Sequence, residues 1–219
     1  MVKAVSVQDL AKVAAFYDQR FAEQGEQPSS VGWRDQQSQY LRFDYLFQGY
    51  DGQHKTILDV GCGFADLYHY LFKKYGNRFH YIGIDTSAAL LSVAKKHCHA
   101  QNSEFFHGDL HAWYQQASKN KQSIDFAVES GMLSFKLDNN NDYAQQIMAL
   151  MYELANDGIA MNFLSDQVDY QLDKNHHFSA QQVLHWASGL SRHWVIYQDY
   201  PLWEFTLQLY KSAKQLRGL

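Results

Sequence analysis

The chain of 219 residues is long enough for one domain with extensions and too short for two full-sized domains. With 46% hydrophobic and 19% charged residues it has enough apolar surface to fold, which excludes a disordered protein. Its 19 Lys and Arg against 23 Asp and Glu give a net charge of −4, which disfavours nucleic acid as the main partner.

Two helices are predicted in the first 50 residues. Apolar residues between Val7 and Tyr17 follow a helical stripe, with Ser6 as its N-cap. Gly25 and Pro28 then interrupt the pattern, and a second helix is predicted over 35–47. The sequence therefore favours an N-terminal helical cover placed before the main domain.

After Lys55, short apolar runs alternate with helical stretches of about 10–15 residues. Strands are predicted in TILDV, FHYIGID, SEFFHGD, IDFAVES and GIAMNFLS. A helix from about Asp142 to Asn156 is predicted between the fourth and fifth of these. HWVIYQDY and EFTLQLYK are too close together for a parallel crossover, so they are predicted to pair as an antiparallel hairpin. The pattern predicts an α/β fold with a mostly parallel sheet and helices on both faces.

The segment ILDVGCGFADL runs from a strand through a glycine turn into a helix. Gly61 and Gly63 let the backbone approach a ligand closely, and the helix that begins near Asp66 directs its N–H groups toward that ligand. The alternative is that Asp59 and Gly61 only shape the turn. Cys62 is interpreted as a small filler residue in this loop.

Acids follow at the ends of the next two strands. Asp85 lies 22 residues after Gly63, where an acid in such sheets binds the hydroxyls of a ribose, and its strand end is expected to be reachable by solvent. Asp109 follows the third strand and can accept the amino hydrogens of an adenine. Asp85 as an ordinary strand-end acid and Asp109 as a helix N-cap alone remain alternatives.

The ligand suggested by this arrangement is an adenosine that carries positive charge. A third fingerprint glycine is missing and Asp66 disfavours a pyrophosphate, which counts against a nicotinamide oxidoreductase. No GK[ST] motif for a P-loop is present. An acid at the mouth of the site suits S-adenosylmethionine (SAM), which has a sulfonium and an ammonium.

ILDVGCGFADL, YIGID, EFFHGDL and IDFAVESG resemble, in order and spacing, the motifs of class I SAM-dependent methyltransferases. The resemblance covers about Lys55 to Lys211. It implies a Rossmann-like sheet of seven strands in the order 3-2-1-4-5-7-6, with strand 7 antiparallel, over residues 51–219, and a helical cover over residues 1–50. GWRDQQSQYLRF, ESGM, NFLS and DYPLWEFTLQLY are similar to a small bacterial subset of undefined substrate.

The resemblance also implies roles for residues of this chain. Asp59, Gly61 and Gly63 would lie along the methionine portion of SAM, Asp85 at the ribose, and Asp109 with Leu110 at the adenine. Glu129, Ser130 and Gly131 would end the fourth strand where the methyl group meets its acceptor, with a buried structural role as the alternative for Glu129. Trp33 and Arg42 would fold over the cofactor. Arg42 would pair with the methionine carboxylate, or else with an acid of the chain itself.

Candidates for catalysis are few. Glu129, His176 and His177 are the possible bases, although two adjacent histidines on a loop are more often solvated. No set of residues has zinc-ligand spacing, so no metal site is predicted. A general base is needed only for a protonated acceptor, and a carboxylate acceptor would need none.

A small-molecule acceptor is predicted, methylated on O or N, because ESGM stands where enzymes that methylate base amines have [ND]PP[YF]. Its walls are expected at Trp33, residues 130–132 and the loop 165–178. The alternatives are a SAM-binding protein without turnover and a protein or RNA acceptor. The sequence has two cysteines and shows no signal peptide or membrane-length apolar run, which predicts a cytoplasmic location. A monomer or homodimer is expected.

Overall fold

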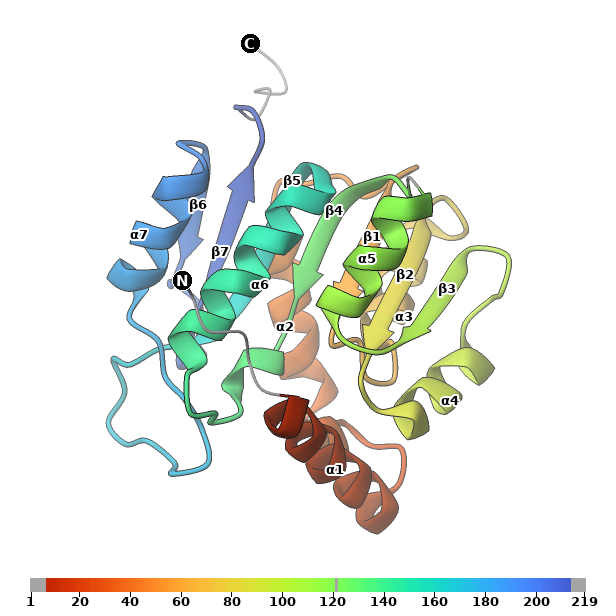
Figure 1. The fold of residues 1–219 in the computed structure, drawn as a ribbon, viewed down its shortest axis with the longest axis horizontal. Coiled ribbons are helices and arrows are strands. Elements are labelled where there is room, and N and C mark those ends of the chain that lie inside the picture. Colours follow the sequence, from red (N-terminus) through yellow and green to blue (C-terminus); the bar gives the residue numbers. More distant parts are fainter. Residues whose placement is uncertain (1–6, 121, 214–219) are drawn as a thin grey trace.

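The computed structural model describes residues 7–120 and 122–213, so the predicted N-cap Ser6 lies outside the described residues. Its centre is a seven-stranded sheet in the order β3-β2-β1-β4-β5-β7-β6 (Figure 1). The strands are β1 (Thr56–Val60), β2 (His80–Asp85), β3 (Ser103–His107), β4 (Ile124–Glu129), β5 (Ala155–Leu164), β6 (Trp194–Tyr197) and β7 (Glu204–Tyr210). Only the pairings of β7 with β5 and with β6 are antiparallel. The predicted strand order and the antiparallel seventh strand are confirmed.

Helices cover both faces of the sheet, as predicted. The helices are α1 (Val7–Gln24), η1 (Pro28–Val31), α2 (Gln36–Leu46), α3 (Asp66–Tyr75), α4 (Ala88–His97), α5 (Leu110–Asn120), η2 (Met132–Ser134), α6 (Asn140–Leu154) and α7 (Ala180–Leu190). One buried cluster joins the sheet to α5, α6 and α7, and another joins it to α2, α3 and α4. The apolar runs of β1, β2, β4, β5 and β7 are continuous because most of their residues are buried on both faces, whereas β3 and β6 at the two edges of the sheet are more exposed.

Strand alternation supplies both clusters. In β1, Ile57 belongs to the cluster with α2 and α3, whereas Leu58 belongs to the cluster with α5 and α6. In β4, Phe126 and Ala127 divide in the same way. A site at the ends of these strands is therefore positioned by a core that holds it from both sides.

The boundary between α6 and β5 differs from the prediction. A helix to about Asn156 and a strand from Gly158 were expected, but α6 ends at Leu154 and β5 begins at the next residue. Asp157 does not break the strand because its carboxylate accepts from Lys55 Nζ and from the Tyr50 hydroxyl, both at 2.8 Å. Asn156 is likewise satisfied by Ser123 Oγ, at 2.9 Å.

β7 lies between β5 and β6, close against β5. A Cβ on Gly158 of β5 would lie 2.4 Å from the carbonyl oxygen of Leu209, so only glycine fits there. All seven residues of β7 are buried. Because β5 runs parallel to β4, its end and the loop after it lie at the same edge of the sheet as the ends of β1, β2 and β4.

The N-terminal segment has two parts. The cluster that contains α3 also buries Phe43 and Leu46 of α2 and Phe47, which follows α2. α1 instead lies across the carboxyl ends of the parallel strands (Figure 1), where Tyr17 and Phe21 pack on a small cluster with α4. The division of the chain at residue 50 stays a prediction, since α2 shares the main core. Among residues 7–120 and 122–213, no helix has the length and hydropathy to cross a membrane.

Candidate active site

The turn after β1 is held by the end of β2. The N–H groups of Gly61 and Cys62 both donate to the Ile84 carbonyl, at 2.8 and 2.9 Å. Gly61 and Gly63 have φ angles of 79° and 54°, which glycine adopts without strain. A Cβ on Gly61 would also lie 2.9 Å from the Cβ of Met132. The glycine at 61 is thus required by conformation and by packing, a second reason that the sequence did not show.

Asp85 ties two turns together. Its Oδ2 accepts from the Gly63 N–H and its Oδ1 accepts from the Ser87 N–H, each at 2.8 Å. Burial raises its pKa above the ordinary value. Each carboxylate oxygen keeps a further lone pair, so the group can also accept two ribose hydroxyls. The sequence predicted a ligand role for this residue, with an ordinary strand-end acid as the alternative, and the structure adds a role in holding the two turns.

Asp59 lies at the β1 side of the same turn. Its side chain is buried and its Oδ2 accepts from the Tyr81 hydroxyl at 2.6 Å. Burial, together with the negative charges of Asp85 and Asp66, raises its pKa to about 7 even though the Tyr81 bond opposes the shift. A positively charged ligand in the cavity would favour the ionised form of this carboxyl group.

Gln39 of α2 reaches across to the first turn of α3. Its Nε2 donates to Asp66 Oδ2 at 2.9 Å, which fixes the orientation of the amide. Its Oε1 is buried and has no partner among the described residues. A buried acceptor beside carboxylates fits a ligand that brings a charged donor, such as an ammonium. Sequence reasoning missed Gln39, because nothing in the sequence separates it from Gln36 and Gln37.

These groups line a first cavity of about 90 Å³ at the carboxyl ends of β1, β2 and β3. It brings together most of the predicted cofactor residues, namely Trp33, Asp59, Gly61, Gly63, Asp85, Asp109 and Leu110. Small-molecule pockets usually enclose about 300–1,000 Å³. Val31 and Trp33 of the N-terminal segment are among the residues that line this cavity. Asp109 also caps α5, because its Oδ1 accepts from the Ala112 N–H at 2.8 Å.

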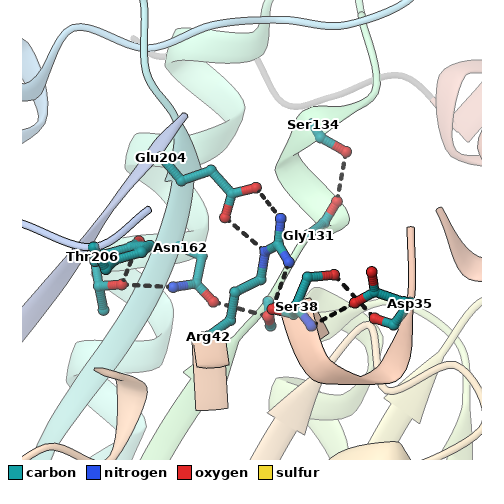
Figure 2. A network of polar contacts seen from close by, with 10 residues as sticks. Asp35, Ser38, Arg42, Gly131, Ser134, Asn162, Glu204 and Thr206 are labelled. Atoms are coloured by element: carbon teal, nitrogen blue, oxygen red, sulfur yellow. Dashed lines mark hydrogen bonds and ion pairs between the residues drawn. The ribbon is translucent and has the colours of Figure 1, made fainter. Parts of the chain in front are cut away.

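Arg42 is held by the chain itself and does not line the first cavity. Its Nε donates to Glu204 Oε2 at 2.6 Å, its Nη2 donates to Glu204 Oε1, and its Nη1 donates to the Ser38 carbonyl at 2.7 Å (Figure 2). Both partners of the ion pair are buried. The structure therefore places Arg42 as an interelement ion pair, and the pairing with a cofactor carboxylate predicted from the resemblance is not supported.

Glu129 does not line the first cavity either. It is fully buried, its Oε1 accepts from the Leu133 N–H at 3.3 Å, and its Oε2 has no partner among the described residues. Burial raises its pKa to about 8, so it is mostly protonated at neutral pH. This is the buried structural acid left open by the sequence. Residues 130–132, which follow it, line the cavity in its place.

Trp33 separates the first cavity from a second one. The Cζ atom of Arg42 lies 4.4 Å from the centre of the Trp33 ring. A Cβ on Gly131 would lie 2.4 Å from the Trp33 ring, so glycine is required there. Trp33, Gly131 and Tyr17 line both cavities. The ion pair of Arg42 and Glu204 thus supports the wall between them.

The second and third cavities, of about 300 and 270 Å³, lie between the N-terminal segment and the loop 165–178. They share the lining residues Arg34, Arg42, Leu164, Leu172, Asn175 and Glu204. Each predicted acceptor wall contributes to this region, with Trp33 and Gly131 at the inner end and Leu172 and Lys174 from the loop. Together the two cavities are large enough for a metabolite-sized molecule.

The two candidate histidines lie in different surroundings. His177 Nδ1 lies 2.7 Å from the Ser165 carbonyl, which only accepts, so Nδ1 bears the proton. Its Nε2 is buried without a partner among the described residues, and His177 lines the third cavity. His176 packs edge-on against Phe178 and lines none of the three cavities. Since the first and third cavities share no residue, His177 is placed to contact a molecule in the third cavity, not the junction at Trp33.

The chain matches a family model. That model is described as a methyltransferase domain and covers residues 51–200. No curated protein matches the chain.

Solved structures share its fold. The magnesium protoporphyrin IX methyltransferase of Synechocystis PCC 6803, with bound S-adenosylhomocysteine (SAH), aligns over 96% of this chain and 90% of its own, with a TM-score of 0.56 and 12% identity. A mycolic acid cyclopropane synthase complexed with SAH aligns over 88% and 78%, with a TM-score of 0.61 and 14% identity. The pyocyanin biosynthetic protein aligns over 94% and 70%, with a TM-score of 0.55 and 12% identity.

Proposed function

Since the chain belongs to the methyltransferase domain family and folds as a class I SAM-dependent methyltransferase, we propose that it methylates a small molecule held in the second and third cavities. The observation that carries this proposal is the junction at Trp33 and Gly131, which line both the first and the second cavity, while the third cavity adjoins only the second. The acceptor then approaches from the side of the loop 165–178.

The residues of the first cavity fit SAM as the cofactor. The unpartnered Oε1 of Gln39, with Asp66 and Asp59, suits the ammonium, and the free lone pairs of Asp85 suit the ribose hydroxyls. Asp109 lines the same cavity, which supports its role as the acceptor for the adenine amino group. When bound, SAM supplies an electrophilic methyl group whose leaving group is a neutral thioether.

The contribution of the protein is to align the acceptor and exclude water. Tyr17 and Trp33 cover the junction, and burial raises the pKa of Tyr17, so its hydroxyl stays protonated. Glu129 is fully buried, and His177 lines the third cavity. The residues that line both cavities at the junction, Tyr17, Trp33 and Gly131, include no carboxylate or imidazole that could act as a general base, which supports an acceptor atom that arrives with a free lone pair.

Two measurements test this function. Calorimetry should show that SAH binds in the micromolar range, about 8 kcal/mol, and that NAD does not. Methyl-labelled SAM, incubated with metabolite extract, bulk RNA and denatured protein, should label only the metabolite fraction. Label confined to RNA or protein would contradict the small-molecule acceptor, and binding of NAD without SAH would contradict the cofactor.

We also propose a cytoplasmic location and a monomeric or homodimeric state. Cys62 and Cys98 are buried free thiols, as in proteins of a reducing compartment. One structural relative, aligned over 94% of this chain at 12% identity with a TM-score of 0.62, is described as a possible exported protein of Bordetella parapertussis. Cell fractionation with a periplasmic marker would distinguish the two locations, and light scattering would give the assembly state.

A further inference from the structure

The charge that lines the second cavity is opposite to that of the whole chain. Four cations line it, Arg20, Arg34, Arg42 and Lys174, against a single acid, Glu204. The chain as a whole has a net charge of −4. Because Arg42 and Glu204 neutralise each other, the lining keeps three cationic side chains.

Little elsewhere neutralises these three. Arg34 pairs with Asp35 at 2.8 Å, but the side chains are 79% and 44% exposed, and exposed pairs contribute little. The remaining N–H groups of that guanidinium stay available. Arg20 donates through Nη2 to the Ser29 carbonyl, and its Nε has no partner among the described residues. Lys174 forms no ion pair within the described part of the chain. Even with Asp35 counted against Arg34, the cavity keeps a positive surplus.

Aromatic rings form much of the remaining lining. Phe16, Trp33, Phe135 and Phe163 line the second cavity. In the third cavity, Tyr170 and Trp203 are 74% and 63% exposed, which places two large aromatic side chains in water at its rim. Exposed apolar groups that gather in a patch mark ligand-binding grooves and other interaction sites. Rings together with cations recognise a molecule that has a flat apolar body and a negative charge.

We propose that the methyl acceptor is a small aromatic or similarly flat organic anion, such as a carboxylate, with its charged group held by Arg20, Arg34 and Lys174. The proposal rests on the proposed function, since only then is the occupant of this cavity an acceptor. An anion is also attracted to the sulfonium of SAM, whereas a cationic acceptor would be repelled from the same junction. The positive lining thus selects the class of substrate within a chain of negative net charge.

Three probes with one ring system test the charge selectivity: 1-naphthoate, 1-naphthamide and 1-naphthylmethylammonium. Their binding is measured by saturation-transfer NMR and calorimetry, on protein saturated with SAH. Naphthoate should bind at least about tenfold more tightly than the other two, and its affinity should fall as salt is raised. Undetectable naphthoate binding, equal binding of the three probes, or preference for the ammonium would overturn the proposal.

Charge-reversal variants locate the binding. The double variant Arg34→Glu with Lys174→Glu should lose at least about tenfold in naphthoate affinity. The matched control, Arg192→Glu with Lys119→Glu, reverses two exposed cations outside the three cavities and should keep the wild-type affinity. Unchanged naphthoate binding in the first variant would overturn the proposal. SAH affinity is measured on each protein as well. If the wild-type protein did not bind SAH, that result would count against the proposed function instead.

Discussion

The buried amide of Gln39 offers a direct test of how the first cavity holds its ligand. Gln39→Met keeps the volume of the side chain and removes both polar atoms. The change removes the donor to Asp66 Oδ2 and the Oε1 that has no partner in the described structure. Fold and binding are expected to respond differently, because the first group is satisfied in the free protein and the second is not.

The magnitudes follow from those two atoms. Loss of the bond to Asp66 costs about 1–3 kcal/mol of unfolding free energy, whereas removal of a buried unpartnered acceptor returns about 1–3 kcal/mol. The two nearly cancel, so stability should change by less than about 1 kcal/mol. A charge-assisted bond from the ammonium to Oε1 is expected to contribute about 1.5–3 kcal/mol to binding. SAH affinity should therefore fall by about 10–150-fold.

Calorimetry with two ligands isolates this contact. 5′-Methylthioadenosine shares the adenosine of SAH but lacks the ammonium, so Gln39→Met should leave its affinity within about twofold of the wild type. Gln37→Met, at an exposed position of the same helix, serves as the matched control and should bind both ligands normally. Thermal unfolding of each protein checks the stability. Equal weakening of both ligands, or no weakening of SAH, would refute the reasoning.

Three further outcomes are expected. Asp85→Asn should weaken the binding of both SAH and methylthioadenosine, which calorimetry measures. It should also lower stability by about 1–3 kcal/mol in thermal unfolding, because the N–H of Gly63 or Ser87 loses its acceptor. Glu129, whose pKa is raised to about 8 in the fold from an ordinary 4.5, binds more protons folded than unfolded between these values, so stability should fall as pH rises through that window. Glu129→Gln should flatten this decline in urea titrations across pH, and an unaltered slope would contradict the assignment. Hydrogen exchange should show that SAH protects residues 7–33 more than residues 36–46, which are already held by the core; equal protection with and without SAH would mean that the segment does not move.

Local sequence patterns were enough to predict most of the fold. Runs buried on both faces and separated by helical stretches specify a parallel sheet, and the few residues between HWVIYQDY and EFTLQLYK require a hairpin. The rest of the strand order was predicted from a family resemblance, because the sequence of one strand does not indicate which strands pair with it. The boundary near Asn156 was misplaced because its polar residues find partners across the sheet edge, at Ser123 and Lys55.

Positions at strand ends were predictable, and contacts between distant segments were not. Gly61, Asp85 and Asp109 lie at or just after the ends of β1, β2 and β3, so the edge of the sheet brings them together. The partner of Arg42 lies 162 residues away in β7, and no spacing rule connects the two. Gln39 and Met132 likewise reach the cavity through packing of α2 and of the turn after β4.

β7 is the strand that joins β6 to the rest of the sheet. Within the described chain β6 pairs only with β7, while β7 pairs with β5 from Gly158 with Tyr210 to Leu164 with Glu204. Without β7 in place, β5 would present an unpaired edge, which is a template for pairing with another chain. A side chain at residue 158 would obstruct the docking of β7, so a substitution of Gly158 would promote association of the protein as well as lower its stability.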